Sequence, residues 1–242
     1  MATGTIEFVA PIAGLRLHPI DASNSHPAVE KIVVETRDDK RLRIIFHLVD
    51  VFTFEEAEAI AEGILPSIVN RLAFYRNVRV GEPHFTGGSL PKDASGSSYT
   101  VTNSIRIRDS VVADIAPNET GRRELARLLE EPYTHNELYS AYRFAGNQSD
   151  AVARFMFLYN ILLQLHNDSQ REVDDFIRGE MPSVPQSPSP HNPSVVETVY
   201  TRLRNEVGHR RLRTAPEQTR TEIEGNVAAL QELVKTAIWR AI

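Results

Sequence analysis

The sequence predicts an α+β fold, in which a mixed domain built on a sheet precedes an all-helical domain. Segments rich in β-branched and apolar residues are concentrated in the first half of the chain, whereas apolar residues at helical spacing dominate the second half. The pattern changes near Pro117, and 242 residues are enough to bury two cores. We therefore expect an α+β domain over residues 1–117 and a helical domain over residues 118–242.

The elements expected in the first half are short strands and one helix. The predicted strands are Thr5–Ala10, Lys31–Thr36, Leu42–Val49, Val78–Phe85 and Tyr99–Ile107. Arg37–Lys40 has the polarity and length of a hairpin turn, and the Gly- and Ser-rich segment Gly87–Ser98 is expected to be an exposed loop. A helix from Thr53, a suitable N-cap residue, to about Tyr75 is expected to kink or split at Pro66.

The second half is expected to consist of helices around one proline-rich loop. Helical spacing predicts helices over Asn118–Glu131, Thr134–Ala145, Ser149–His166, Gln170–Arg178, Val195–Val207, and from Ala215 onward. Ser194 and Glu197 have the spacing of a capping box for the fifth of these helices. Residues 181–193 contain five prolines, so we expect them to form an extended or mobile connection.

The composition excludes several classes of protein. There is no cysteine, and therefore no disulfide, thiolate metal ligand or cysteine nucleophile. No run of about 18 apolar residues occurs, and Glu7 interrupts the only apolar stretch near the N-terminus. We therefore expect no membrane association and a cytoplasmic location. The histidines lack the spacing of metal ligands, so neither a metal nor another cofactor is expected.

Charge is distributed unevenly along the chain. The net charge of −5 argues against a protein that coats nucleic acid indiscriminately. Glu197–Arg220 nevertheless contains six arginines and only three glutamates. This local excess indicates a focused site for an anion. The alternative is a solvated helix end whose arginines pair with carboxylates elsewhere.

Arg204, Asn205 and His209 are the candidate catalytic residues, because RNA can be cleaved without a metal by groups of these kinds. The 2′-hydroxyl attacks the adjacent phosphate when a base removes its proton, an acid protonates the leaving 5′-oxygen, and positive charge stabilises the phosphorane. His209 can act as base or acid, and Arg204 can bind the non-bridging oxygens. Asn205 can orient the histidine or bind the phosphate. The arginines expected to bind the RNA backbone are Arg202, Arg210, Arg211 and Arg213.

Two interpretations of this segment remain open from the residues alone. Positions five apart on a continuous helix point about 140° away from each other, so Gly208 is expected to bend the chain and bring His209 toward Arg204. Alternatively, Arg204 pairs with Glu197 or Glu206, and His209 only caps the C-terminus of the helix.

The spacing of Arg204-Asn205 and His209 resembles the R-x4-6-H motif of HEPN (higher eukaryotes and prokaryotes nucleotide-binding) domains, in which a polar residue commonly follows the arginine. The apolar helix around Phe155–Leu165, the variable loop and the closing helix also resemble that family, and the Apea-like branch most closely. The resemblance covers Asn118–Ile242. Arg211 departs from members that have a tyrosine two residues after the histidine.

The resemblance implies a metal-independent RNA endonuclease acting as a stress or phage-defence effector. It also implies a homodimer formed through the C-terminal helices, with a site composed from both copies, and an activator or antitoxin as a further partner. The α+β domain would then recognise a trigger, a partner or the substrate. The alternative is a non-catalytic HEPN-like module for dimerisation, nucleotide binding or protein interaction.

Overall fold

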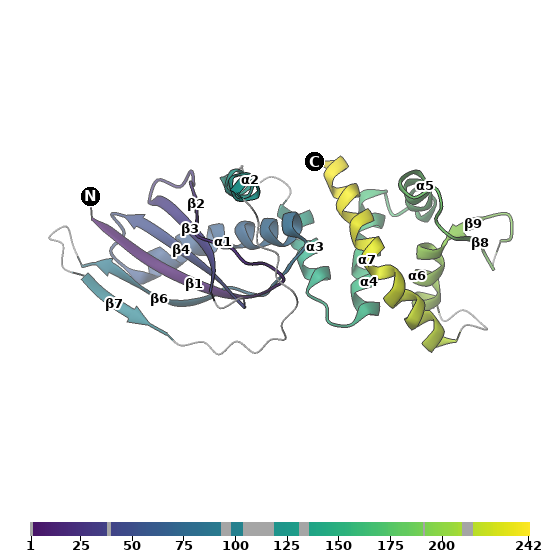
Figure 1. Cartoon of the computed structure of the whole chain (residues 1–242), viewed down its shortest axis with the longest axis horizontal. Coiled ribbons are helices and arrows are strands. Elements are labelled where there is room, and N and C mark those ends of the chain that lie inside the picture. The colour runs from purple at the N-terminus through teal and green to yellow at the C-terminus, as the bar shows by residue number, and fades with distance from the viewer. Residues whose placement is uncertain are drawn as a thin grey trace. The chain divides into compact units, whose positions relative to one another are not determined.

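The computed structural model describes residues 2–37, 40–92, 98–103, 119–130, 136–190, 192–209 and 215–242. Contacts divide the chain into two compact units, Met1–Arg143 and Phe144–Ile242 (Figure 1). The first contains an antiparallel sheet and the second is mostly helical, which confirms the predicted α+β class. The division falls later than the change of pattern near Pro117, because α2 (Glu119–Glu130) packs on the first unit through Leu125 and Leu129.

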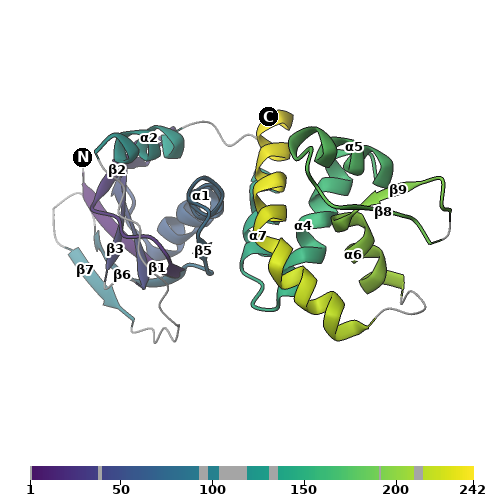
Figure 2. The same ribbon diagram turned by 45° about the vertical axis from the view of Figure 1, so that its right-hand side comes forward.

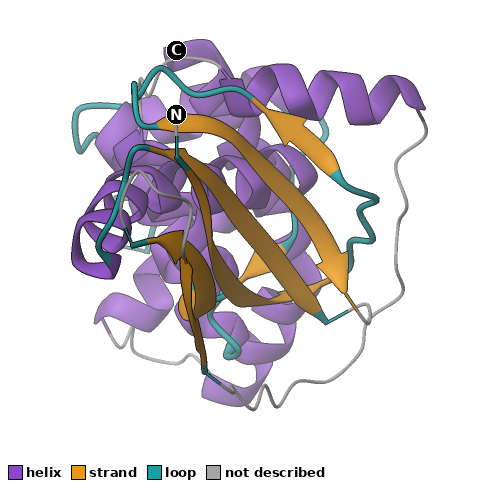
Figure 3. Cartoon of the chain, turned by 90° about the vertical axis from the view of Figure 1, so that its left-hand side faces the viewer, coloured by secondary structure: helices purple, strands orange, loops and turns teal. Residues whose placement is uncertain are grey.

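The sheet of the first unit has the strand order β2-β3-β4-β1-β6-β7, and β5 pairs with the C-terminal end of β1. Figure 3 shows strands of this sheet side by side in orange. The strands are β1 (Thr3–Ala13), β2 (Ile20–Ala22), β3 (Val29–Arg37), β4 (Arg41–Val49), β5 (Arg79–Val80), β6 (His84–Pro91) and β7 (Ser98–Thr102). All pairings are antiparallel. The predicted hairpin is confirmed, because Arg37 pairs with Arg41 at the end of the β3–β4 ladder.

Two predictions about the later strands were wrong. The strand expected over Val78–Phe85 is divided into β5 and β6, because Pro83 lacks the N–H that a continuous ladder needs. The loop expected over Gly87–Ser98 was placed too early, because Gly87 to Pro91 belong to β6, which pairs with both β1 and β7. Residues 93–97 of this loop lie outside the described residues.

Buried and more exposed residues alternate along the strands, so the sheet has one apolar and one polar face. On β1 and β4 the even-numbered residues, such as Ile6, Phe8, Ile44 and Phe46, are buried in the core. Helix α1 (Phe54–Arg76) covers this face with apolar side chains that include Ile64, Leu65, Ile68 and Leu72. The odd-numbered residues of the same strands therefore lie on the opposite face of the sheet.

Helix α1 begins as predicted but is not split. Thr53 is its N-cap, and its side chain accepts a hydrogen bond from the N–H of Glu56 at 3.3 Å. The helix continues through Pro66 to Arg76, and Asn77 ends it in the left-handed conformation. Pro66 and Glu62 are both exposed, so the Glu62 carbonyl that loses its helical partner can bind water instead.

The second unit is built from four helices and a short hairpin, and α3 (Asn136–Gly146) crosses the division between the units. The elements are α4 (Ala151–Leu165), α5 (Gln170–Glu180), β8 (Gln186–Pro188), β9 (Val196–Thr198), α6 (Val199–His209) and α7 (Pro216–Ala241). Helix α4 packs along α7, and α6 packs against both. The core is formed by Phe155, Leu158, Leu162, Leu203, Ile223, Leu230 and Val234.

The segment before α6 differs from its prediction. Part of the proline-rich segment is extended, as expected, and forms β8, which pairs with β9. The helix expected to start at Val195 starts at Val199, and Glu197 lies in β9 instead of a capping box. In the part of the chain that the structure describes, no helix is long and apolar enough to cross a membrane.

Candidate functional site in the helical unit

Helix α6 places Arg204 and Asn205 in its middle and continues through Gly208 to His209. The helix is therefore not interrupted at Gly208, where a bend was expected. The side chain of His209 and the predicted RNA-binding residues Arg210, Arg211 and Arg213 lie outside the described residues.

Asn205 is the central hydrogen-bonding residue of the motif. It is only 4% exposed, and its side-chain oxygen accepts hydrogen bonds from Arg204 and from Gln170, each at 3.0 Å. Its amide nitrogen donates to Glu197 at 3.4 Å. Because Glu197 is itself 5% exposed, the motif is connected to a buried carboxylate. Asn205 thereby joins α6 to α5 and β9.

A second buried carboxylate, Asp174, lies beside this group. One of its oxygens accepts hydrogen bonds from the Thr198 N–H at 3.0 Å and from the Thr201 hydroxyl at 2.7 Å. Tyr159 lies 2.7 Å from the same Thr201 oxygen. Since Thr201 has one proton and directs it to Asp174, Tyr159 is the donor in the second bond.

The charged residues of this group affect the pKa of the Tyr159 hydroxyl. Burial raises the pKa of Tyr159 most, the negative charges of Asp174 and Glu197 raise it further, and Arg204 acts in the opposite direction. These residues therefore form one electrostatic unit, which we call the polar cluster. Its members are Tyr159, Gln170, Asp174, Glu197, Thr198, Thr201, Arg204 and Asn205.

A hollow of about 590 Å³ opens next to the polar cluster, between α5 and the β8–β9 hairpin. Figure 2 shows α5, α6, β8 and β9 side by side in this unit. The cluster members that line the hollow are Gln170, Asp174, Glu197 and Thr201. Arg171 and Arg178 line it as well and were not predicted as site residues. Their seven-residue spacing on one helix is the signal that could have identified them.

Arg202, predicted to bind RNA, makes ion pairs within the unit. Its guanidinium donates to Glu206 at 2.6 Å and also to Glu222 of α7. Thr219 donates to the other Glu206 oxygen at 2.7 Å. Burial is the largest single influence on the pKa of Arg202 and lowers it. The hydrogen bonds to the two carboxylates and their negative charges together outweigh burial, so the pKa of Arg202 is raised. Arg202 therefore connects α6 to α7 with its charge compensated.

Replacing Arg202 with leucine is expected to lower the free energy of unfolding by about 1–2 kcal/mol. The reason is that the Glu206 side chain, which is 9% exposed, would lose its cation. Urea unfolding of the full chain measures the effect. The matched control is Arg220→Leu, because Arg220 also has two carboxylate partners but is 53% exposed. Equal losses of stability in the two variants would show that the Arg202 ion pairs have no special structural role.

Comparison of the chain with protein-family models, curated proteins and solved structures finds no match. Within the described ranges, no group of three histidine, aspartate or glutamate side chains is placed to hold a metal ion.

Proposed function

We propose that the helical unit is a HEPN-type, metal-independent endoribonuclease that uses Arg204, Asn205 and His209. The observation that supports this best is the polar cluster itself. Two carboxylates, Asp174 and Glu197, are each about 95% buried beside the motif, which incurs a desolvation cost that an apolar core would avoid. Networks of this kind are often retained because they hold functional groups in a fixed geometry.

In the proposed reaction, Arg204 binds the non-bridging oxygens of the phosphate and stabilises the charge that develops on them. Its hydrogen bond to Asn205 fixes the guanidinium before the substrate binds. His209 transfers a proton. The 2′-oxygen forms a bond to phosphorus while the bond from phosphorus to the 5′-oxygen breaks. The proton of the 2′-hydroxyl goes to the base, the acid protonates the 5′-oxygen, and the products are a 2′,3′-cyclic phosphate and a 5′-hydroxyl.

The proposed active form is a homodimer through the C-terminal helices. Positions five apart on a helix project about 140° away from each other, so we do not expect a single motif to bring Arg204 and His209 to one phosphate. Two motifs facing each other across a twofold axis would supply the arginine of one copy and the histidine of the other. A second histidine would also provide an acid in addition to the base.

The test is cleavage of a tRNA and mRNA pool by the full chain in EDTA. The wild type is expected to produce 2′,3′-cyclic phosphate ends. His209→Ala is expected to reduce the rate by roughly 100-fold or more, and Arg204→Ala by a similar factor. His18→Ala, which changes an exposed histidine of the other unit, is the matched control and should cleave normally. Full activity of His209→Ala would refute the proposal.

The second candidate is a non-catalytic module for dimerisation, nucleotide binding or protein interaction. It is favoured by one observation, that Arg204 and Asn205 bond to each other and Asn205 is almost fully buried. In that case the motif stabilises the unit without reacting. A dimer on sizing that leaves the RNA pool intact would support this candidate and contradict the nuclease.

A further inference from the structure

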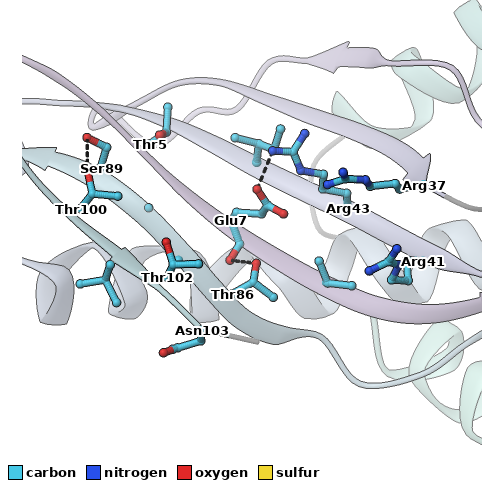
Figure 4. Close-up of a pocket in the computed structure, with 15 residues that line it drawn as sticks. Thr5, Glu7, Arg37, Arg41, Arg43, Thr86, Ser89, Thr100, Thr102 and Asn103 are labelled. Carbon is cyan, nitrogen blue, oxygen red and sulfur yellow. Dashed lines mark hydrogen bonds and ion pairs between the residues drawn. The ribbon is translucent and has the colours of Figure 1, made fainter. Parts of the chain in front are cut away.

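The polar face of the first unit's sheet, opposite α1, contains a hollow of about 420 Å³ (Figure 4). Three arginines lie toward one end, and hydroxyl side chains line the other. The hydroxyl-bearing residues are Thr5, Thr86, Ser89, Thr100 and Thr102. Volumes of this size are typical of sites for small molecules. The hollow is separate from the motif of the helical unit, so the inference below does not depend on the proposed nuclease.

Two glycines allow β6 to cross the floor of the hollow without side chains. The ladder between β1 and β6 changes register between Glu7 and Phe8, at Thr86 and Gly87. Gly87 has a φ of +146°, and a Cβ there would lie 2.3 Å from the carbonyl oxygen of Val101. Gly88 is equally constrained, because its Cβ would lie 2.3 Å from the carbonyl oxygen of Thr5. The paired strands β7 and β1 therefore require glycine at these two positions, and neither residue adds a side chain to the lining of the hollow.

Arg43 is held in the middle of the face by two carboxylates. It donates to Glu7 at 2.6 Å and to Glu35 at 2.8 Å. The hydrogen bond to Glu7 is the largest cause of the raised pKa of Arg43, and burial opposes it. Figure 4 shows Glu7 and Arg43 meeting on this surface. Glu7 is thus a fixed carboxylate that can accept hydrogen bonds from a ligand's hydroxyl groups.

Arg37 and Arg41 concentrate positive charge at one end of the hollow. They occupy directly paired positions on β3 and β4, and both line the hollow. Side chains at directly paired positions lie close together, so one anion can contact both guanidinium groups. Guanidinium groups bind phosphate oxygens in pairs, which favours a phosphate group at this end.

The rest of the lining favours hydroxyl groups over nucleobases. The hydroxyl of Thr100 donates a hydrogen bond to the hydroxyl oxygen of Ser89 on the adjacent strand at 3.4 Å, and Asn103 adds an amide to the lining. Among the lining residues that the structure describes there is no aromatic side chain on which a base could stack. Rows of hydroxyls and an amide instead match the alternating donors and acceptors of a polyol.

We propose that this hollow binds a small sugar phosphate, with its phosphate between Arg37 and Arg41 and its hydroxyls against Glu7, Ser89, Thr100 and Thr102. The probe is ribose 5-phosphate, titrated into the full chain by calorimetry beside ribose and inorganic phosphate. Ribose 5-phosphate is expected to bind at least ten-fold more tightly than either fragment. Equal binding of inorganic phosphate, or no heat with any of the three, would overturn the proposal.

Variants test the two ends of the site separately. The double change Arg37→Ala and Arg41→Ala is expected to weaken ribose 5-phosphate binding at least ten-fold, while Arg79→Ala, an exposed arginine outside the hollow, is not. Thr102→Val is expected to weaken the binding of ribose 5-phosphate but not the residual binding of inorganic phosphate. Unchanged binding in the double variant would refute the phosphate position. An equal effect of Thr102→Val on both ligands would refute the hydroxyl contact.

Discussion

Replacing Asp174 with alanine is expected to lower the free energy of unfolding of the chain by about 3 kcal/mol. Asp174 is 4% exposed and accepts hydrogen bonds from the Thr198 N–H and the Thr201 hydroxyl. Both donors are buried, so the variant leaves them without their acceptor. Because Thr198 ends β9 and Thr201 lies in the first turn of α6, the expected loss is concentrated where the motif helix begins.

Hydrogen exchange followed residue by residue, together with urea unfolding, measures this effect. The amide of Thr198 should exchange faster in the variant than in the wild type. The control is Asp175→Ala, the neighbouring residue on α5, whose side chain is 59% exposed and pairs with Arg178. Its effect should lie within the error of the measurement. Equal destabilisation by both changes would contradict the assignment of Asp174 as the acceptor that orders this junction.

Gly88→Ala is expected to lower the free energy of unfolding by about 3–5 kcal/mol, which is the largest effect on stability that we expect in the first unit. The added Cβ would lie 2.3 Å from the carbonyl oxygen of Thr5 and 2.9 Å from the Cα of Ile6. Both are backbone atoms of β1, which cannot move aside as a flexible side chain could. The ladder between β1 and β6 must therefore separate.

Gly63→Ala is the matched control, because it makes the same chemical change in α1, where a Cβ meets nothing within 4 Å. Alanine is favoured over glycine in a helix, so the free energy of unfolding of this variant is expected to rise by about 0.5–1 kcal/mol. Thermal unfolding of the two variants beside the wild type separates the outcomes. A Gly88→Ala protein as stable as the wild type would show that β1 and β6 are not paired as described.

The elements that the sequence predicts well are those set by local chemistry. The hairpin between β3 and β4 follows from alternating residues around a polar turn, and Thr53 caps α1 through its own hydroxyl. β6 could not be predicted in this way. Gly87 and Gly88 indicate a loop when only their neighbours are considered, but the backbone of β1 and β7 requires glycine at these positions.

The candidate site was predictable only in part. Arg204 and Asn205 were placed correctly on a helix, because the helical pattern is local. Gln170, the α5 residue that donates to Asn205, could not be found, because it lies 35 residues earlier in the chain. Asp174, which accepts from Thr201 of α6, lies 27 residues before that threonine. Glu197 was assigned to a capping box on spacing alone, whereas the β8–β9 pairing extends the chain there and buries it. Non-local pairing overrode the local signal.

The strand order has a consequence for how the first unit assembles. β1 lies between β4 and β6 and is the only strand that pairs with both, within the part of the chain that the structure describes. During synthesis β1 is made before the other strands of this sheet, yet the edge that pairs with β6 stays open until β6 has been made. Deleting Thr3–Ala13 would leave a three-stranded piece, β2-β3-β4, and a separate β6–β7 hairpin with no shared edge.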